Sequence, residues 1–235
     1  MKRLSFYATL PHDCNYRPEQ LAVSAVADPR AQMTTTIYGD LIERGFRRSG
    51  AHVYAPHCPN CRSCIPTRVV APRFQPNRSQ RRNLRRNTDL GVFRMPARAD
   101  DEYFDLYERY LQGRHPGGGM DDPTPETFEN FLVSHWCETL FVEFRDRGRL
   151  LGLAVTDLLP RGLSATYTFY DPEAGIARGL GTYAILWQIE EALRRQLDHL
   201  YLGYFIPECD KMNYKHRFRP VEGLVDGEWR ELSAD

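Results

Sequence analysis

The sequence predicts an α+β protein, on the basis of two patterns along its 235 residues. Apolar residues recur at helical spacing in several segments, and strand-like runs separated by glycine-containing turns follow one another in the second half. Hydrophobic residues make up 42% of the chain and charged residues 26%, which is ordinary for a globular protein with a real core. We therefore expect one large domain or two small ones.

The first part of the chain is rich in turn residues. Gly45 is a plausible end for one helix, and Asn77 or Ser79 can cap another, because a capping side chain accepts a hydrogen bond from a free helix N–H group. The predicted elements are a helix at 34–45, strands at 52–57 and 64–71, a helix at 79–87 and a strand at 90–97.

The second part begins with helices, continues with a meander of strands and ends with a strand–glycine turn–helix–strand unit. The predicted elements are helices at 100–115 and from Pro125 onward, strands at 139–146, 149–160 and 163–172, a helix at 182–196 and a strand at 199–205. This order is typical of a GNAT-like (acyl-CoA N-acyltransferase-type) domain. The sequence thus predicts an N-terminal cysteine-bearing region over 1–90 and a GNAT-like catalytic domain over 91–235.

Nothing in the sequence indicates a membrane protein. No run approaches the roughly 20 apolar residues of a membrane helix, and the N-terminus has too short an apolar run for a secretory signal. A cytoplasmic location without a membrane partner is therefore expected, and disulfides are not expected among the six cysteines.

The net charge of zero hides an uneven distribution of charge. Only three of the 31 basic residues are lysines, and the stretch from 68 to 98 contains a single acid, Asp89. The arginines in this stretch are Arg68, Arg73, Arg78, Arg81, Arg82, Arg85, Arg86, Arg94 and Arg98. A local field of one sign attracts an anionic partner even on a neutral protein.

Five of these arginines belong to one predicted helix, SQRRNLRRN with the preceding residue. They are Arg78, Arg81, Arg82, Arg85 and Arg86, and their spacing brings them together on one side of a helix. Phosphate oxygens would relieve their mutual repulsion, and guanidinium groups match phosphates bidentately. The alternative is a solvated face whose arginines pair with acids elsewhere in the fold. The scarcity of local acids favours phosphate, and hence nucleic acid.

Three cysteines form the pattern C-x-x-C-x-x-C, with a fourth at a distance. They are Cys58, Cys61, Cys64 and Cys14. Thiolates at this spacing can converge on zinc or on an iron–sulfur cluster. Zinc signatures usually contain two separated pairs, so a reduced loop without metal is an equal alternative.

The segment after the last predicted strand contains two of the three lysines of the chain. Lys211 and Lys215 indicate a role for a compact ammonium group in a protein that otherwise uses arginine, and Tyr214 and Tyr204 add hydroxyls and stacking surfaces. A surface loop is the alternative interpretation of this segment.

The ARGLGT segment resembles an anion cradle in outline. The backbone N–H groups of Gly181 and Thr182 open a helix, and Arg178 lies beside them. The glycines are equally compatible with close packing alone. Two further candidates are Asp171, which can orient or deprotonate an amine but also fits an Asp-Pro turn, and His115, which can act as a base near neutral pH beside Arg114.

A series of motifs is similar to the arginyl/leucyl-tRNA–protein transferase family, and within it to the bacterial leucyl branch. The motifs cover roughly residues 5–222 in the family's order. They are GFRRSG (45–50), Y-x-P-x-C-x-x-C-x-x-C-I-P (54–66), F-x-P-N-R-S-Q-R-R (74–82), RRN (85–87), Y-L-x-x-R-H-x-x-G-G-M (110–120), F-Y-D-P (169–172), L-G-T (180–182), Y-L-G-Y (201–204) and K-M-x-Y-K-x-x-F-x-P (211–220).

This resemblance implies transfer of leucine from Leu-tRNA to the N-terminal Asp or Glu of a protein, which marks that protein for degradation through the N-end rule pathway. It implies tRNA on the arginine helix, and metal or an iron–sulfur cluster on the four cysteines as in eukaryotic relatives. Attack of the amine on an activated ester requires no cofactor and no covalent enzyme intermediate. Arg114, Arg178, Gly181, Thr182, Lys211, Tyr214 and Lys215 would bind the substrates, and Asp171, Tyr170, His115 and Tyr204 would orient or deprotonate the amine.

Three alternatives remain at this point. An arginyl transferase would use Arg-tRNA with the same machinery. A CoA-dependent GNAT acetyltransferase would need a full R/Q-x-x-G-x-G/A loop, of which ARGLGT supplies only part. A non-enzymatic cysteine-knuckle protein that binds nucleic acid would explain residues 54–86 but not the lysine segment.

Overall fold

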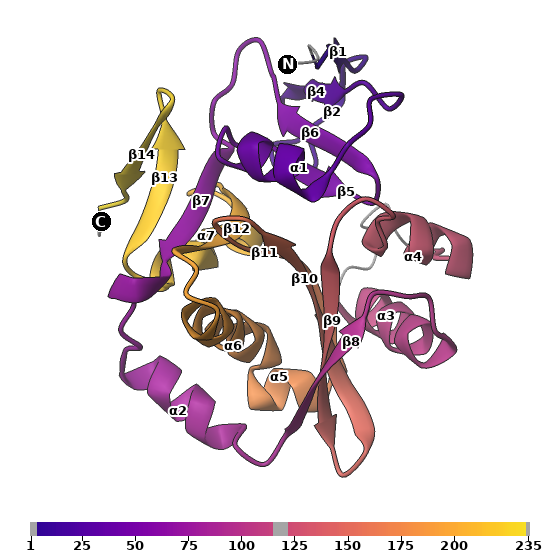
Figure 1. Cartoon of the computed structure of the whole chain (residues 1–235), viewed down its shortest axis with the longest axis vertical. Coiled ribbons are helices and arrows are strands. Elements are labelled where there is room, and N and C mark those ends of the chain that lie inside the picture. Colours follow the sequence, from indigo (N-terminus) through magenta and orange to yellow (C-terminus); the bar gives the residue numbers. More distant parts are fainter. Residues whose placement is uncertain (1–3, 115–121, 234–235) are drawn as a thin grey trace.

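An eight-stranded sheet runs through the centre of the protein (Figure 1). The structure is a computed structural model that describes residues 4–114 and 122–233. In spatial order the strands are β14 (Glu228–Glu231), β13 (Val221–Val225), β7 (Ile65–Val70), β12 (His199–Phe205), β11 (Gly162–Tyr170), β10 (Arg149–Leu159), β9 (Thr139–Asp146) and β8 (Gly91–Pro96). Neighbouring strands are antiparallel except β11 and β12, which are parallel.

The meander from β9 to β11 forms because tight turns join strands of long apolar runs. Arg147 and Gly148 both have positive φ angles of 48° and 88°, which suit the two central positions of a two-residue hairpin turn. All residues of β10 after Arg149 are buried, so this strand is covered on both faces of the sheet. The three strands predicted here, at 139–146, 149–160 and 163–172, are confirmed to within two residues.

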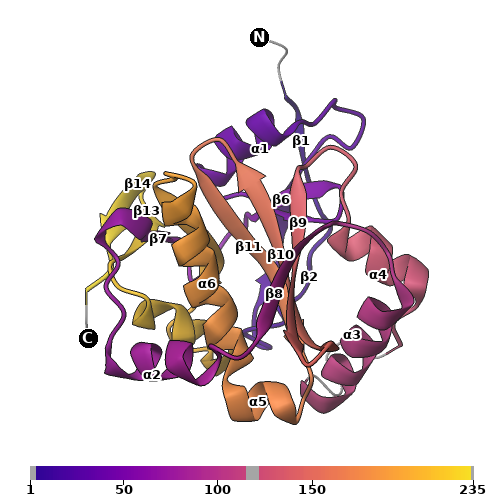
Figure 2. The same cartoon turned by 60° about the horizontal axis from the view of Figure 1, so that its bottom comes forward.

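Helices cover both faces of the sheet (Figures 1 and 2). On one face lie α3 (Asp101–Arg114) and α4 (Pro125–Leu132), whose Tyr107 and Phe128 pack with Phe169 of β11. On the other face lies α6 (Leu180–Arg194), whose Leu180 and Ala184 pack with Phe144 of β9. The short helix α5 (Ala174–Arg178) precedes α6, and α2 (Arg78–Arg86) packs beside α6.

A second, smaller sheet stands at one end of the molecule, at the top of Figure 1. Its strands in order are β1 (Phe6–Ala8), β4 (Ser24–Ala27), β6 (His52–Pro56) and β5 (Arg47–Ser49), and a two-stranded ribbon of β2 (His12–Asp13) and β3 (Leu21–Ala22) accompanies it. Helix α1 (Thr35–Ile42) joins this sheet to the large one, because its buried Tyr38 shares a core with Leu159 of β10 and Tyr201 of β12.

The remaining short elements follow the sheets. These are the 3-10 helix η1 (Ala71–Arg73) after β7, and α7 (Asp210–Asn213) with the 3-10 helix η2 (Tyr214–Arg217) after β12.

The mixed helix–strand architecture expected from the sequence is confirmed. The expected division at residue 90 stays a prediction. The predicted strands at 52–57 and 64–71 both form, but β6 belongs to the small sheet and β7 lies between β13 and β12 in the large one. The cysteine loop between them therefore crosses from one sheet to the other. The β13–β14 hairpin was missed, although Asp226-Gly227 at its turn, both with positive φ, is a strong hairpin signal in the sequence.

Candidate functional site

The arginine helix α2 has two different faces. Asn77 caps its first turn: its side chain accepts a hydrogen bond from the Gln80 backbone N–H at 2.9 Å, and the Gln80 side chain accepts one from the Asn77 N–H at 2.8 Å. Gln80 also donates to the Arg217 carbonyl oxygen at 3.0 Å, and Asn83 donates to the Gly179 carbonyl oxygen at 3.0 Å. These amides fix the inner face against the body of the protein. The capping prediction for Asn77 is confirmed.

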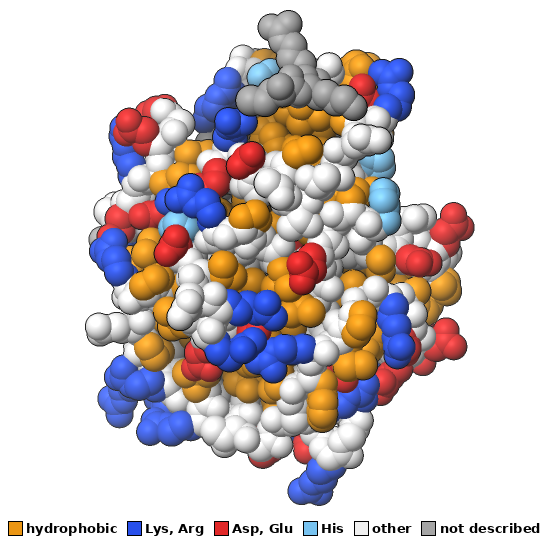
Figure 3. Space-filling model, in the orientation of Figure 1, with side chains coloured by type: hydrophobic (Ala, Val, Ile, Leu, Met, Phe, Trp, Pro, Cys, Tyr) orange, Lys and Arg blue, Asp and Glu red, His pale blue; other side chains and the backbone are white. Residues whose placement is uncertain are grey.

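The outer face carries the five predicted arginines, all of them exposed: Arg78, Arg81, Arg82, Arg85 and Arg86. In the described part of the chain none of the five forms an ion pair, although Arg81 and Arg86 each donate to a backbone carbonyl, those of Pro76 and Ala177. In Figure 3, basic side chains gather at the position that α2 occupies in Figure 1. The face is an uncompensated positive surface, suited to a polyanion.

The other four arginines between 68 and 98 behave differently. Each pairs with an acid from outside the stretch: Arg68 with Glu43 and Glu222, Arg73 with Glu231, Arg94 with Glu191, and Arg98 with Asp100. Pairing with acids elsewhere in the fold, the alternative weighed for the five arginines on α2, is thus found for these four neighbours and not for those five within the described residues.

The predicted anion cradle at ARGLGT is occupied by contacts within the protein. Arg178 donates to both carboxylate oxygens of Asp89, at 2.9 and 2.8 Å, and to Asp146 at 3.2 Å. Gly179 adopts φ of 67°, and a Cβ there would lie 2.7 Å from Asn83 Nδ2. A Cβ on Gly181 would lie 3.3 Å from the ring of Tyr170. The glycines therefore serve the turn and close packing, and Arg178 is already neutralised.

Asp171 is a buried anchor of the turn between β11 and α5. It accepts from Arg109 and Arg149, both at 2.7 Å, and from the backbone N–H groups of Glu173 and Ala174 at 3.1 and 2.9 Å. Burial raises the pKa of this carboxyl, but the bonds from Ala174 and Arg109 outweigh it and hold the pKa below its ordinary value. Such a carboxylate is a poor base, so its geometry fits the turn interpretation.

The other predicted bases are also poorly placed or lie elsewhere. Tyr204 is buried, its hydroxyl donates to the Gly45 carbonyl oxygen at 3.0 Å, and burial raises the pKa of the hydroxyl far above its ordinary value. Tyr170 is half-buried, with its ring 5.0 Å from that of Tyr110. Arg114 is exposed at the end of α3, and His115 lies outside the described residues.

The lysine segment separates its two ammonium groups. Lys211 is exposed on α7, whereas Lys215 in η2 is only 3% exposed. Nζ of Lys215 lies 3.4 Å from the sulfur of Met212 and 4.8 Å from the centre of the Tyr214 ring. Burial, followed by the charge of Arg47, lowers the pKa of Lys215 to about 7. A partly exposed Tyr214 and a buried, poorly solvated Lys215 form one corner of the candidate site.

Arg47 of β5 completes this corner, and the sequence reasoning missed it. Its side chain is 7% exposed; Nη2 donates to the Ala165 carbonyl oxygen at 2.9 Å, and Nη1 is buried without a partner in the described structure. The available signal was the pair of arginines in GFRRSG, an unusual charge density for a short strand. The pattern alone does not show which of the two would be left without a counter-ion.

The four cysteines predicted as metal ligands lie in surroundings that shift the pKa of two of their thiols in opposite directions. Burial, then the neighbouring cysteines, raises the pKa of Cys64 to about 11, whereas a hydrogen bond to Ser63 lowers that of Cys61. All are free thiols, and Cys209 also acts on Cys64. Within 4–114 and 122–233 no group of three Cys, His, Asp or Glu side chains is arranged to hold a metal ion. Binding of zinc or an iron–sulfur cluster by these cysteines stays a prediction.

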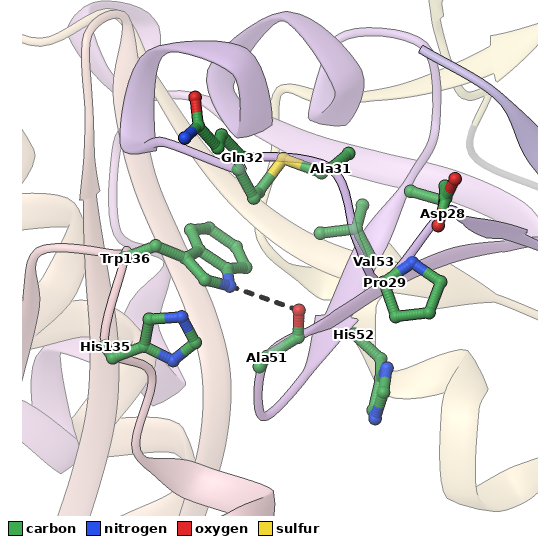
Figure 4. Close-up of a pocket in the computed structure, with 11 residues that line it drawn as sticks. Asp28, Pro29, Ala31, Gln32, Ala51, His52, Val53, His135 and Trp136 are labelled. Atoms are coloured by element: carbon green, nitrogen blue, oxygen red, sulfur yellow. Dashed lines mark hydrogen bonds between the residues drawn. The ribbon is translucent and has the colours of Figure 1, made fainter.

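A cavity of about 310 Å³ lies apart from this site, between the segment preceding α1 and the β5–β6 turn (Figure 4). The Trp136 indole donates to the Ala51 carbonyl oxygen at 3.1 Å on one wall, and His52 and His135 stand at its sides. No residue predicted to act in the chemistry lines it.

Comparison with known proteins identifies the class and then the family. The family model "Arginine-tRNA-protein transferase, N terminus" matches residues 12–82, and the model "Arginine-tRNA-protein transferase, C terminus" matches residues 102–225. With the unpaired arginine face, these matches define a tRNA-dependent transferase class. The chain belongs to the arginine-tRNA-protein transferase family, and the resemblance found in its motifs is confirmed.

Relatives match over the full chain. A protein of Pseudomonas entomophila is 52% identical, with 99% of both chains covered, and one of Marinobacter nauticus is 50% identical, with 100% of this chain and 99% of the relative covered. Both are called aspartate/glutamate leucyltransferase. Among solved structures, L-PGS from Bacillus licheniformis is 14% identical, covers 60% of this chain and 45% of its own, and has a TM-score of 0.41. No described helix has the length and apolar character needed to traverse a bilayer.

Proposed function

We propose that this chain transfers leucine from Leu-tRNA to the N-terminal Asp or Glu of acceptor proteins, marking them for degradation in the N-end rule pathway. Relatives about half identical over the whole chain carry the name of this activity. The observation that carries the proposal is the α2 face, whose five exposed arginines have no acid partner in the described structure. Because tRNA is cytoplasmic, the enzyme works in the cytoplasm.

The reaction joins a free amine to an activated ester. The α-amino group of the acceptor attacks the carbonyl carbon of the ester that links leucine to the terminal ribose, a new amide forms, and the ribose oxygen leaves with a proton. An α-amino group has a pKa of about 8, so an appreciable part is neutral near pH 7. Positioning is therefore the main task of the protein, and no cofactor and no enzyme-bound intermediate are needed.

Within this function the arginine face of α2 holds the phosphates of the tRNA. Lys211, which is exposed on α7, receives the 3′ end of the tRNA, and Tyr214 offers a ring for stacking. Lys215 receives a carboxylate of the acceptor. Tyr170 orients the amine, and Asp171 and Arg178 act through the turn and packing that they stabilise.

The scaffold for these groups is a GNAT-like catalytic part that follows the cysteine-bearing region. The CoA-dependent acetyltransferase alternative is disfavoured, because the arginine of its phosphate loop, Arg178, is held by Asp89 and Asp146. Acetyl-CoA should consequently give no protection against thermal unfolding, whereas tRNA should give it.

The test is transfer of labelled amino acid from Leu-tRNA or Arg-tRNA to peptides beginning with Asp, Glu or Ala. We expect labelling from Leu-tRNA of the Asp and Glu peptides alone. Equal labelling of all three peptides, or none, contradicts the proposed function. Labelling from Arg-tRNA instead makes the protein an arginyl transferase, and tRNA binding without transfer makes it a binding protein.

A further inference from the structure

Arg47 and Arg48 are neighbours on β5 with opposite surroundings. Arg48 is fully buried and forms a two-pronged ion pair with Asp157 of β10, Nε to Oδ2 at 2.8 Å and Nη2 to Oδ1 at 2.6 Å. Asp157 also accepts from Thr139 at 2.8 Å and from Thr166 at 2.7 Å. The Asp157 carboxylate is fully engaged and has no capacity left for a second arginine.

Arg47 has no such counter-ion. Within the described residues its side chain forms no ion pair: Nη2 donates to the neutral carbonyl of Ala165, and Nη1 is buried without a partner. The groups on which its charge acts most clearly are the hydroxyls of neighbouring tyrosines and one ammonium, namely Tyr38, Tyr54, Tyr204, Tyr214 and Lys215. Arg47 thus lies in a neutral, aromatic surrounding with a second cation.

That second cation, Lys215, comes from a segment 168 positions further along the chain in the sequence. Neither Lys215 nor Arg47 forms an ion pair with any described residue, and Nζ of Lys215 has a sulfur and an aromatic ring as neighbours. Gly203 of β12, with φ of 82°, lies against the guanidinium: a Cβ at that position would be 3.6 Å from Nε of Arg47. This is an ordinary van der Waals distance, so the Arg47 side chain packs directly against β12.

Two buried cations without an anion are costly. An isolated charge that leaves water loses several kcal/mol of solvation, which only a paired, hydrogen-bonded partner offsets. A carboxylate is the anion that matches both groups, because it accepts from a guanidinium and an ammonium at once. Among the described residues, no carboxylate forms an ion pair with Arg47 or Lys215. A substrate that brings a carboxylate to these two cations would therefore bind strongly and selectively.

We propose that Nη1 of Arg47 and Nζ of Lys215 together bind the side-chain carboxylate of the N-terminal Asp or Glu of the acceptor. This inference rests on the proposed function and adds a residue, Arg47, that determines its specificity. The corner selects acidic N-termini, since an amide of the same shape leaves both cations buried without charge compensation. A phosphate of the tRNA is the other anion of similar chemistry, and the experiment separates the two.

The test compares Arg47→Met with wild type on peptides that begin with Asp or with Asn. The expected result is a kcat/KM for the Asp peptide lowered about 100-fold, as for removal of one member of a buried charge pair. The value for the Asn peptide changes little, so the preference for Asp collapses. Arg44→Met is the matched control, because Arg44 is exposed in the same segment; it keeps the wild-type preference.

Three outcomes overturn the inference. The Asp preference persists in Arg47→Met; or both peptides lose activity equally while binding of Leu-tRNA weakens, which assigns the anion to tRNA; or wild type labels neither peptide, which also removes the proposed function. Where circular dichroism shows that Arg47→Met is unfolded, Lys215→Met carries the same comparison with the same expected loss of preference.

Discussion

The α2 face and the Arg47–Lys215 corner are both cationic, and they differ in nearly every physical respect. On α2 the guanidinium groups stand in water, so each costs little to maintain and salt weakens its attraction for a partner. At the corner the two cations are nearly inaccessible to water, so their charge is expensive and salt scarcely screens it. Exposed charge suits a large polyanion recognised by its backbone, and buried charge suits one small anion recognised by its shape.

The difference also assigns the two substrates of the proposed reaction to two surfaces. Helix α2 touches the lysine segment through Gln80, which donates to the Arg217 carbonyl oxygen, two residues beyond Lys215. This hydrogen bond joins the surface that we propose for the donor to the segment that we propose for the acceptor. The following variants test this difference between exposed and buried cations.

The largest effect is expected where a buried arginine does have its counter-ion. Asp157→Asn removes the charge opposite Arg48 while it preserves size, so it should destabilise the protein by about 3–5 kcal/mol. Urea unfolding measures the change in the free energy of unfolding. Asp28→Asn, at an ion pair with the exposed side chain of Arg30, is the control and should change stability much less. Equal effects of the two variants would contradict the contrast between buried and exposed charge.

At the Arg47–Lys215 corner, removing a buried charge should stabilise the protein, whereas Asp157→Asn should destabilise it. The pKa of Lys215 is lowered to about 7 from 10.5, so above pH 7 the unfolded chain holds a proton that the folded protein releases. Stability should therefore rise with pH from about 7 to 10. Lys215→Met, which lacks the charge, should be more stable than wild type by roughly 2–4 kcal/mol at pH 6.5, with the difference shrinking as pH rises.

Thermal unfolding of both proteins from pH 6.5 to 9.5 checks this expectation. Two groups act on the charge of Lys215: Arg47 lowers the pKa of its ammonium and Cys209 raises it. The Tyr214 ring also lies against the ammonium. Lys211→Met, at the exposed lysine of the same segment, serves as the control: it keeps Lys215, so its stability should follow the pH dependence of wild type. A constant difference between Lys215→Met and wild type would mean that the buried lysine is not the titrating group.

A smaller, salt-sensitive effect is expected on α2. Replacing Arg81 and Arg82 by alanine should weaken tRNA binding roughly tenfold and reduce the slope of log K against log salt by about 1.8, if each arginine neutralises one phosphate. Turnover at saturating tRNA should be spared. The control removes Arg73 and Arg98, which already hold Glu231 and Asp100, and should change the slope less. If the slope of log K against log salt were unchanged in the Arg81 and Arg82 double variant, α2 would not bind the tRNA phosphates.

The smallest effect concerns the start of the same helix. Asn77→Ala removes the cap from the first turn and should cost about 1 kcal/mol of stability, measured by chemical unfolding. Ser79→Ala removes the exposed alternative cap and should have little effect. The reverse order would show that the helix begins at Ser79 instead.

Local features were predictable because they depend on neighbours in the sequence. The spacing of Arg78 to Arg86 predicts a helix with a basic side, and the structure places that helix at 78–86. The meander and α6 follow in the same way from apolar periodicity and from glycine turns. The Asp226-Gly227 pair is also a local hairpin signal, so the β13–β14 hairpin could have been predicted from the sequence.

Candidate site residues were harder to predict because their roles depend on partners far along the chain. Asp171 looked like a base, but Arg109 and Arg149 converge on it from a helix and a strand. Tyr204 looked reactive, but its hydroxyl is bonded to the Gly45 carbonyl oxygen, 159 residues away. A local sequence pattern does not show such contacts between residues that are far apart in the chain.

The sequence by itself determined the family, the mixed helix–strand class and the presence of an arginine-rich helix with a polar outer face. Only the tertiary structure decided which cations are compensated. It places the carboxylate of Glu191, 97 residues away, beside Arg94 and that of Asp157 beside Arg48. Among the residues that it describes, no acid pairs with the α2 arginines or with Arg47. The reason is physical: a charge is neutralised by whatever the fold brings within a few ångströms, and that distance is set by packing rather than by sequence order.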